Sequence, residues 1–366
     1  MKYFVLAGEI SGDIHAARLV EALKHQDAEA KVFGWGGEEM QRVGVDISVL
    51  LHKLAFMGFW EVLKNIFSII SLFKLAKKEI LNVQPDIIIL VDYPGFNLRM
   101  AKWAKKKGFA VAYYISPQIW AWKSSRVKII RDYVDKMFCI FPFEQDFYKK
   151  HGVNVSYIGH PLAAVLRSRA LRRSAYSTNL DTIALLPGSR KQEIQRGLPV
   201  MLAFAEKFPD HKFVVSGLTV FGEAFYTDKK FPKNVELRMD DSGGILEEAM
   251  FAVVTSGTAT LETALIGVPQ VVVYKTSPIS FWLAKKMIKV PFISIVNLIY
   301  GKKIVEELIQ KSFTAERLSH AFRAFLQNKQ TGNPYPNFFE RLYLENSTQM
   351  AAQEIINLTL KEKKSK

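Results

Sequence analysis

The sequence predicts an α/β protein with two lobes, each built on a doubly wound parallel sheet, facing a central cleft. Three observations predict this. The chain has 366 residues, more than one core usually organises, so two domains of about 150 to 200 residues each are expected. Short apolar runs alternate with helical patterns, as in parallel sheets covered on both faces. The second half also repeats the order of strand, turn and helix that opens the first.

The first half opens with a buried strand at Lys2–Ala7, the turn Gly8–Asp13 and a helix from about Ile14 to Lys24. The Ser- and Arg-rich stretch Arg167–Asn179 is the predicted linker, which places the amino-terminal lobe at residues 1–168. Further strands are expected at Lys31–Phe33, Ile87–Val91, Val111–Ile115 and Lys136–Phe141.

The second half has a strand at Thr182–Leu186, a turn at Pro187–Arg190 and a helix to about Phe208. We assign this lobe to residues 180–344. Residues 345–366 form a carboxyl-terminal helix with a basic tail, which packs back on the first lobe or on a partner chain. Further strands are expected at Lys212–Ser216, Val235–Arg238, Ala252–Thr255 and Gln270–Tyr274.

The net charge of +15 predicts an anionic partner: nucleic acid, anionic lipid or a phosphorylated metabolite. The sequence has no RNP-like aromatic motif or zinc-finger spacing, which argues against nucleic acid. The single cysteine, Cys139, lies in an apolar stretch and fits a buried residue in a reducing cytoplasm. No signal peptide is expected, because the first apolar run is short and reaches Glu9 at once. No membrane span is expected, because the longest uncharged stretch, Gly108–Trp122, contains Pro117 and polar residues and is too short.

Two turns in the second half suit a nucleotide. Gly188, Ser189 and Arg190 lie between a buried strand and a helix, where N–H groups and a guanidinium can bind phosphate. Arg190 is also predicted to be catalytic, because its charge can offset the charge on a departing nucleotide. An ordinary turn with a surface arginine is the alternative. Ser256, Gly257 and Thr258 form a second such turn, and Glu262 lies about one helical turn later, within reach of a ribose. A capped helix with a favourably placed acid is the alternative there.

Polar groups also follow strands of the first half. Asp92 ends the apolar run Ile87–Val91 and could act as a general base, or it could only bond the Pro-Gly turn behind it. The turn after the first strand adds Glu9, Ser11, Gly12 and Asp13, which favours an acceptor pocket. We expect no metal site, since there is no Asp-x-Asp after a strand and no paired histidine and acid.

The segment Phe56–Lys78 carries polar residues every three or four positions and large apolar residues elsewhere. A helix packed on the sheet explains about half of that apolar surface. The remainder favours an interfacial helix or acyl-chain groove beside anionic head groups. The residues predicted to make it are Phe56, Met57, Phe59, Trp60, Ile66, Phe67, Ile70 and Phe73.

These motifs, in this order, resemble the lipid-A-disaccharide synthase family, glycosyltransferases of the two-lobed GT-B type. The resemblance covers nearly the whole chain. It is carried by Ala7–Asp13 (AGEISGD), Phe56–Gly58 with Glu61-Val62, Asp92–Asn97 (DYPGFN), Ser116–Trp122 (SPQIWAW), Phe141–Glu144 (FPFE), Ile158–Pro161 (IGHP), Leu185–Arg190 (LLPGSR), Ser256–Glu262 (SGTATLE), and Phe281–Lys285 (FWLAK) with Asn297.

The resemblance implies transfer of diacylglucosamine from UDP onto lipid X, a diacylglucosamine 1-phosphate, with inversion at the anomeric carbon. It implies that Asp92 is the essential acid, that Arg190 and both second-lobe turns hold UDP, and that Asn97 and Asn297 line the acceptor side. No cofactor is implied. The expected location is cytoplasmic and peripheral to the inner membrane; a homodimer is left open.

The chain departs from the family pattern at Gly95, where many relatives have a second Asp, and at Ala164, which replaces an acid. Two other functions compete with glycosyl transfer. A UDP-sugar epimerase on the same fold would need the nucleotide turns but not the apolar segment. A basic nucleic-acid or membrane-binding module would not need Asp92.

Overall fold

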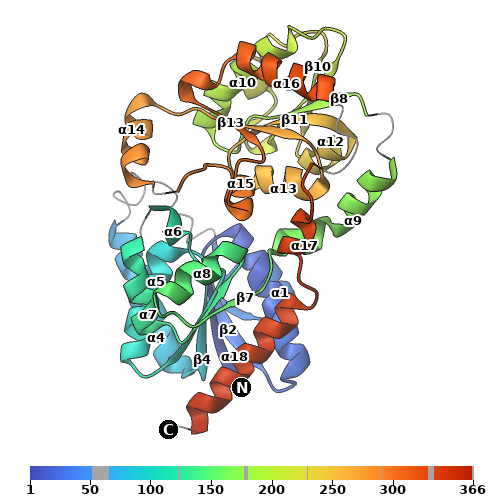
Figure 1. Ribbon diagram of the computed structural model, residues 1–366. Coiled ribbons are helices and arrows are strands. Elements are labelled where there is room, and N and C mark those ends of the chain that lie inside the picture. Colours follow the sequence, from blue (N-terminus) through green and yellow to red (C-terminus); the bar gives the residue numbers. More distant parts are fainter. Residues whose placement is uncertain are drawn as a thin grey trace. The chain divides into compact units, whose positions relative to one another are not determined.

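The computed structural model forms two compact units, Met1–Pro161 with Leu344–Lys366 and Leu162–Tyr343 (Figure 1). Each unit is an α/β body with its own sheet. The structure describes residues 1–51, 66–122, 124–176, 180–228, 230–288, 290–328 and 334–364.

The first unit has a seven-stranded sheet in the order β3-β2-β1-β4-β5-β6-β7, and all its pairings are parallel. The strands are β1 (Lys2–Ala7), β2 (Lys31–Gly36), β3 (Asp46–Leu50), β4 (Ile87–Val91), β5 (Ala110–Tyr114), β6 (Lys136–Cys139) and β7 (Val155–Tyr157). Strand β4 is fully buried, as its run of β-branched residues predicts for a central parallel strand.

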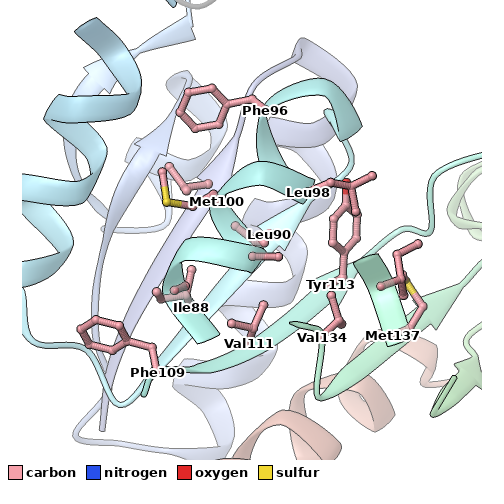
Figure 2. Close-up of a cluster of buried hydrophobic side chains, with 14 of the residues drawn as sticks. Ile88, Leu90, Phe96, Leu98, Met100, Phe109, Val111, Tyr113, Val134 and Met137 are labelled. Atoms are coloured by element: carbon pink, nitrogen blue, oxygen red, sulfur yellow. The ribbon is translucent and has the colours of Figure 1, made fainter. Parts of the chain in front are cut away.

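Helices cover this sheet, and the apolar side chains between the sheet and its helices form one core (Figure 2). The core includes Leu90 and Val111 from the sheet, Leu98 and Met100 from α5, and Val134 after α7. The helices are α1 (Ile10–Gln26), α2 (Glu38–Arg42), α4 (Ile66–Val83), α5 (Pro94–Lys106), α6 (Ile119–Trp122), η2 (Ser124–Arg126), α7 (Val127–Tyr133), α8 (Pro142–Lys150) and α18 (Ser347–Lys364).

The second unit repeats this architecture with a six-stranded sheet in the order β10-β9-β8-β11-β12-β13. The strands are β8 (Thr182–Leu186), β9 (Lys212–Gly217), β10 (Val235–Met239), β11 (Ala249–Thr255), β12 (Gln270–Tyr274) and β13 (Glu306–Ile309). The helices are α9 (Pro161–Tyr176), α10 (Lys191–Ala205), η4 (Thr219–Phe221), α11 (Ala224–Thr227), α12 (Ser242–Glu248), α13 (Thr258–Ile266), α14 (Pro278–Met287), α15 (Ile295–Tyr300), η5 (Gln310–Ser312), α16 (Ala315–Asn328) and α17 (Phe338–Leu342).

Both sheets reverse their winding at one point, between β1 and β4 in the first unit and between β8 and β11 in the second. In open α/β sheets, ligands bind outside the carboxyl ends of the strands at this switch point. The predicted polar turns follow these four strands. The fold therefore brings the turns together in pairs, one pair in each unit.

The predicted linker at Arg167–Asn179 is wrong, because helix α9 covers most of it. Arginines fasten this helix to α12: Arg169 Nη1 and Arg172 Nη2 lie 3.1 and 2.9 Å from Glu247 Oε1, and Arg173 donates to the carbonyl of Ala249. The charged residues that suggested a solvated linker are therefore ion-pair partners along a helix.

Three strands were missed from the sequence: β3, β7 and β13. They are edge strands of three to five residues whose side chains are mostly half-buried or exposed. They lack the continuous apolar run that marks a central strand. The first helix also begins earlier than predicted, at Ile10, because Ser11, Gly12 and Asp13 form its first turn.

The carboxyl-terminal helix α18 belongs to the first unit, where it packs on α1 (Figure 1). Gln26 donates to the carbonyl of Gln349, and Lys136 forms an ion pair with Glu354. The sequence left open whether this helix packs on the first lobe or on a partner chain, and in the structure it packs on the first lobe.

Candidate active site

A pocket of about 250 Å³ opens at the carboxyl edge of the second unit's sheet, where β8, β9 and β11 end. It is lined by Leu186, Pro187, Gly188, Ser189, Glu193, Ser216, Leu218, Ser242, Thr255, Ser256, Gly257, Thr258, Ala259 and Glu262. Six of the seven residues predicted to bind the nucleotide therefore line one pocket.

Two helices begin at this pocket, and no side chain caps either of them. Arg190 is the first flanking residue of α10, Gly257 that of α13, and neither makes a side-chain cap hydrogen bond. The first N–H groups of a helix have no partner within the helix and carry its positive partial charge. Two such ends at one pocket favour a ligand with more than one phosphate.

Two carboxylates, Glu262 and Glu193, line the pocket. Glu262 is half-buried, and its Oε2 lies 3.4 Å from the hydroxyl of Ser242. Burial raises the pKa of Glu262, while the charge of Arg169 and the bond from Ser242 act in the opposite direction. Glu193 is the second carboxylate.

Arg190 does not line the pocket. Its side chain is 78% exposed, and Nη1 lies 3.2 Å from Glu193 Oε1. Because the guanidinium is exposed, its ion pair with the less exposed Glu193 is a weak interaction. Its predicted contact with phosphate stays a prediction.

In the first unit, strand register brings Glu9 and Asp92 close together. Ala7 at the end of β1 pairs with Val91 at the end of β4, so Gly8 and Asp92 leave the sheet side by side. A side chain at residue 8 would collide with the ring of Tyr93, 2.4 Å from an added Cβ. Glycine at this position therefore lets the two turns approach.

The backbone at Asp92 and Tyr93 is left-handed, with φ of 44° and 47°, which is costly for residues other than glycine. Two side chains hold this turn: Asn97 Nδ2 and the Tyr113 hydroxyl donate to the carbonyl of Asp92 at 2.9 and 2.6 Å. Asn97 also donates to the carbonyls of Leu6 and Val91. The buried side chain of Asn97 thus fixes the two strand ends that present Asp92.

Burial raises the pKa of Asp92 to about 6, and the charge of Glu9 adds to that effect. Burial also raises the pKa of Glu9. A carboxylate whose pKa lies near neutrality is suited to accepting a proton during catalysis. Asp92 is thus a candidate general base, and Glu9 is a neighbouring acid that helps to raise its pKa.

The sequence matches the protein family described as lipid-A-disaccharide synthetase over residues 3–357. The chain belongs to the lipid-A-disaccharide synthase family. It is 39% identical over 334 residues to the lipid-A-disaccharide synthase of Syntrophus aciditrophicus, spanning 88% of this chain and 87% of that protein. It is 40% identical over 333 residues to the enzyme of the same name from Trichlorobacter lovleyi, spanning 87% and 86%.

Solved structures share the fold at much lower identity. The UDP-GlcNAc 2-epimerase of Neisseria meningitidis is 14% identical, with a TM-score of 0.61 over 99% of this chain and all of that one. A kitacinnamycin glycotransferase is also 14% identical, with a TM-score of 0.66 over 98% of both chains. These similarities confirm the predicted GT-B fold, and the family confirms the predicted class of enzyme, a glycosyltransferase.

The other residues predicted on the acceptor side have different surroundings. Ser11 is exposed, whereas Gly12 is buried, and an added Cβ there would lie 3.7 Å from Ala7 Cβ and 3.8 Å from Val91 Cγ1. Asp13 is buried, and its carboxylate accepts hydrogen bonds from the N–H groups of Gly37, Glu39 and Met40 at the start of α2. The carboxylate of Asp13 is therefore bonded to the protein backbone.

Asn297 belongs to the second unit and does not line the nucleotide pocket. It is fully buried. Its amide donates to the Val305 carbonyl and to Glu307, and it accepts from the N–H groups of Ile304 and Val305. All of these partners belong to the protein, so the amide anchors the loop before β13.

Of the apolar residues predicted to meet lipid, Phe56, Met57, Phe59 and Trp60 lie outside the described residues. Ile66 and Phe67 lie in α4, but their side chains are outside the description. Ile70 is 46% exposed. Phe73 is partly buried against the core, and its ring meets that of Phe96 edge-on with 5.4 Å between the ring centroids. Phe73 therefore packs on its own unit, as the alternative of a helix packed on the sheet predicts.

Two further family motifs, Ser116–Trp122 and Phe141–Glu144, meet at Glu144, which is fully buried. Its carboxylate accepts from the Ser116 hydroxyl and the Trp120 indole, both at 2.8 Å, and from the N–H groups of Ile140 and Phe141. Glu144 therefore fastens the SPQIWAW segment to the start of α8. The two departures from the family pattern, Gly95 and Ala164, are both exposed.

Sequence reasoning missed Glu193, Ser216 and Ser242 in the pocket. Glu193 could have been found from its spacing, since it falls in the first turn of the helix after Arg190. Ser216 could have been found from its place near the end of β9, the next strand along the sheet. Ser242 begins α12, and its contact with Glu262 joins residues 20 positions apart, which the sequence does not reveal.

Within the described residues, no group of three or more His, Cys, Asp or Glu side chains could hold a metal ion. In the same residues no helix is long and apolar enough to cross a bilayer.

Proposed function

We propose that this chain transfers 2,3-diacylglucosamine from UDP to the 6-hydroxyl of 2,3-diacylglucosamine 1-phosphate, releasing UDP and forming the β-1,6 disaccharide. The observation that carries the proposal is the pocket between two uncapped helix starts in the second unit, with Glu262 beside it. Membership of the lipid-A-disaccharide synthase family supplies the identity of the two sugars.

The reaction is one in-line displacement. The acceptor hydroxyl oxygen forms a bond to the anomeric carbon while the bond from that carbon to the diphosphate oxygen breaks. The hydroxyl proton passes to Asp92, and UDP leaves with the electron pair. The raised pKa of Asp92, caused by burial and by Glu9, supports its role as the base.

The negative charge on the departing diphosphate has to be offset. The N–H groups at the starts of α10 and α13 would do this, joined by Arg190 once its side chain turns from Glu193 to the phosphates. Glu262 would accept from the ribose hydroxyls. The proposal includes no metal and no cofactor.

The substrates carry acyl chains, and we extend the proposal to peripheral binding at the anionic inner face of a bacterial membrane. Helix α4 supports this, since Ile70 and Leu75 are 46% and 39% exposed and lie beside the exposed lysines Lys74 and Lys78. Apolar side chains flanked by lysines are typical of helices at a lipid surface.

The test is to incubate the protein with UDP-2,3-diacylglucosamine and lipid X and to follow UDP and the disaccharide. We expect turnover that requires lipid X, and a fall of roughly a hundredfold or more for Asp92→Ala. Asp132→Ala, an exposed acid paired with its neighbour Arg131, is the matched control.

Two outcomes would contradict the proposal. Conversion of a UDP-sugar without any acceptor would favour an epimerase. Unchanged UDP release from Asp92→Ala would remove Asp92 from the mechanism.

A further inference from the structure

Helix α14 (Pro278–Met287; labelled in Figure 1) belongs to the second unit, and most of its described side chains are exposed. Among its described side chains, only Phe281 and Ala284 are even partly buried. Ile279 is 75% exposed and Trp282 56% exposed, and Met287 and Ile288 follow at 43% and 41%. Large apolar side chains that are this exposed contribute little to packing within the unit and point to a partner.

The sequence on both sides of this helix carries charge of one sign. Residues 263–305 contain six lysines (275, 285, 286, 289, 302 and 303) and no Asp, Glu or Arg. Lys286 Nζ lies 3.7 Å from the centroid of the Trp282 ring. Of the lysines in this stretch that the structure describes, none forms an ion pair with a carboxylate. Exposed apolar and uncompensated basic groups thus occupy the same helix.

We propose that α14 lies on the surface of an anionic phospholipid bilayer, with Ile279 and Trp282 in the head-group boundary and Lys285 and Lys286 against lipid phosphates. Tryptophan and lysine are the residues that anchor helices at this depth. Ile279, Trp282 and both lysines are exposed, so a planar lipid surface suits the helix better than a single enclosed acyl chain. This deepens the proposed membrane binding, on which it rests, by assigning a contact in the second unit.

The chain offers a direct way to measure this contact. Its single cysteine, Cys139, is buried, and burial raises the pKa of its thiol, so it is a poor target for labelling. Ile279→Cys can therefore be labelled with a polarity-sensitive dye in the full-length protein. The matched control is Val220→Cys, because Val220 is a similarly exposed residue (81%) in η4 of the same unit.

On phosphatidylethanolamine vesicles containing phosphatidylglycerol, we expect the label at position 279 to shift to the blue and gain intensity. The label at position 220 should not respond. The response should weaken on vesicles without phosphatidylglycerol and at high salt. A label at position 279 that stays unchanged while the protein floats with the vesicles would overturn the proposal.

A flotation assay without labels gives a second measurement. Replacing two basic side chains, with Lys285→Gln and Lys286→Gln together, should weaken partitioning roughly tenfold or more, and Ile279→Ser with Trp282→Ser should weaken it several-fold. Lys230→Gln with Lys233→Gln is the charge control, since these exposed lysines lie between Asp228 and Glu236. Equal losses for control and α14 variants would reject a specific role for the helix.

Light scattering after gel filtration tests the competing occupant, a second copy of the chain. The proposal fails if the wild type is a dimer, if the Ile279→Ser and Trp282→Ser double variant is a monomer, and if that variant binds vesicles as well as the wild type does. In that case the helix is a dimer contact. These assays need no turnover, so a protein that binds vesicles through α14 but lacks transferase activity would refute the proposed function alone.

Discussion

Glu9 and Asp92 follow neighbouring strands, and the negative charge of Glu9 adds to burial in raising the pKa of Asp92 to about 6. The two carboxylates come from sequence positions far apart and meet only because β1 and β4 pair at the switch point of the sheet. Because Glu9 helps to raise the pKa of Asp92, a substitution at Glu9 can change the pH dependence of the reaction while Asp92 stays in place.

The first prediction concerns that pH dependence. If Asp92 must be ionised to accept a proton, kcat/KM should rise with pH and reach half its plateau near pH 6. Glu9→Gln removes a negative charge that favours the protonated form of Asp92, so the pKa of Asp92 falls and the acid limb moves to lower pH. The measurement is the pH profile of UDP release.

Glu38→Gln, which neutralises an exposed acid at the start of α2, should leave the limb in place. An acid limb that does not move in Glu9→Gln, or that moves to higher pH, would mean that Glu9 does not act on the catalytic ionisation.

The second prediction concerns the sugar of the nucleotide. Glu262 is half-buried in the pocket with Ser242 as its polar neighbour. If its carboxylate accepts from the ribose hydroxyls, Glu262→Gln should weaken UDP binding by about ten- to a hundredfold, the range for a hydrogen bond to a charged group. Calorimetric titration gives the affinity.

The same titration with 2′-deoxy-UDP tells a ribose contact from general damage. The wild type should prefer UDP, and Glu262→Gln should bind both ligands with nearly equal affinity. If the variant keeps the full preference for UDP, the ribose is recognised elsewhere.

Strand ends could be predicted from the sequence because central parallel strands are continuous apolar runs. Ile87–Val91 is fully buried, and the residue after it has to leave the sheet at the edge where ligands bind. The turns after β8 and β11 follow the same rule, which is why their residues were predicted to meet and do line one pocket.

Side-chain partners could not be predicted, because they depend on segments that only the fold brings together. The sequence places Asp13 in a polar turn beside Glu9, which suggested a substrate contact. The structure turns it toward backbone groups 24 to 27 residues away. The side-chain N–H groups of Asn97 and Asn297 likewise donate to protein partners, which only coordinates could reveal.

The third prediction concerns Gly188, whose φ of 110° is unfavourable for other residues. An added Cβ would lie 2.8 Å from Glu193 Oε2 and 3.2 Å from Thr255 Cγ2. Gly188→Ala should therefore lower the free energy of unfolding by about 1 to 2 kcal/mol and also reshape the pocket. Urea unfolding and UDP titration measure the two effects separately.

Gly222→Ala is the matched control, since Gly222 also has a positive φ, 73°, but an added Cβ meets no atom within 4 Å. It should lose stability and keep its affinity for UDP. If both variants lose affinity equally, the loss reflects weakened folding and not the shape of the pocket.

The last prediction separates anchoring from substrate binding in the first turn of α1. Asp13 accepts three backbone hydrogen bonds at 2.7, 3.0 and 3.2 Å, whereas Ser11 is exposed. Asp13→Asn turns an amide N–H toward backbone donors, so the free energy of unfolding should fall by about 1 to 3 kcal/mol. Ser11→Ala should change the free energy of unfolding little.

Urea unfolding of the two variants gives these values, and kinetics with lipid X show whether either residue contacts the acceptor. A stable Asp13→Asn protein with a raised KM for lipid X would return Asp13 to the acceptor site, because in that case its carboxylate would be serving the substrate and not the start of α2.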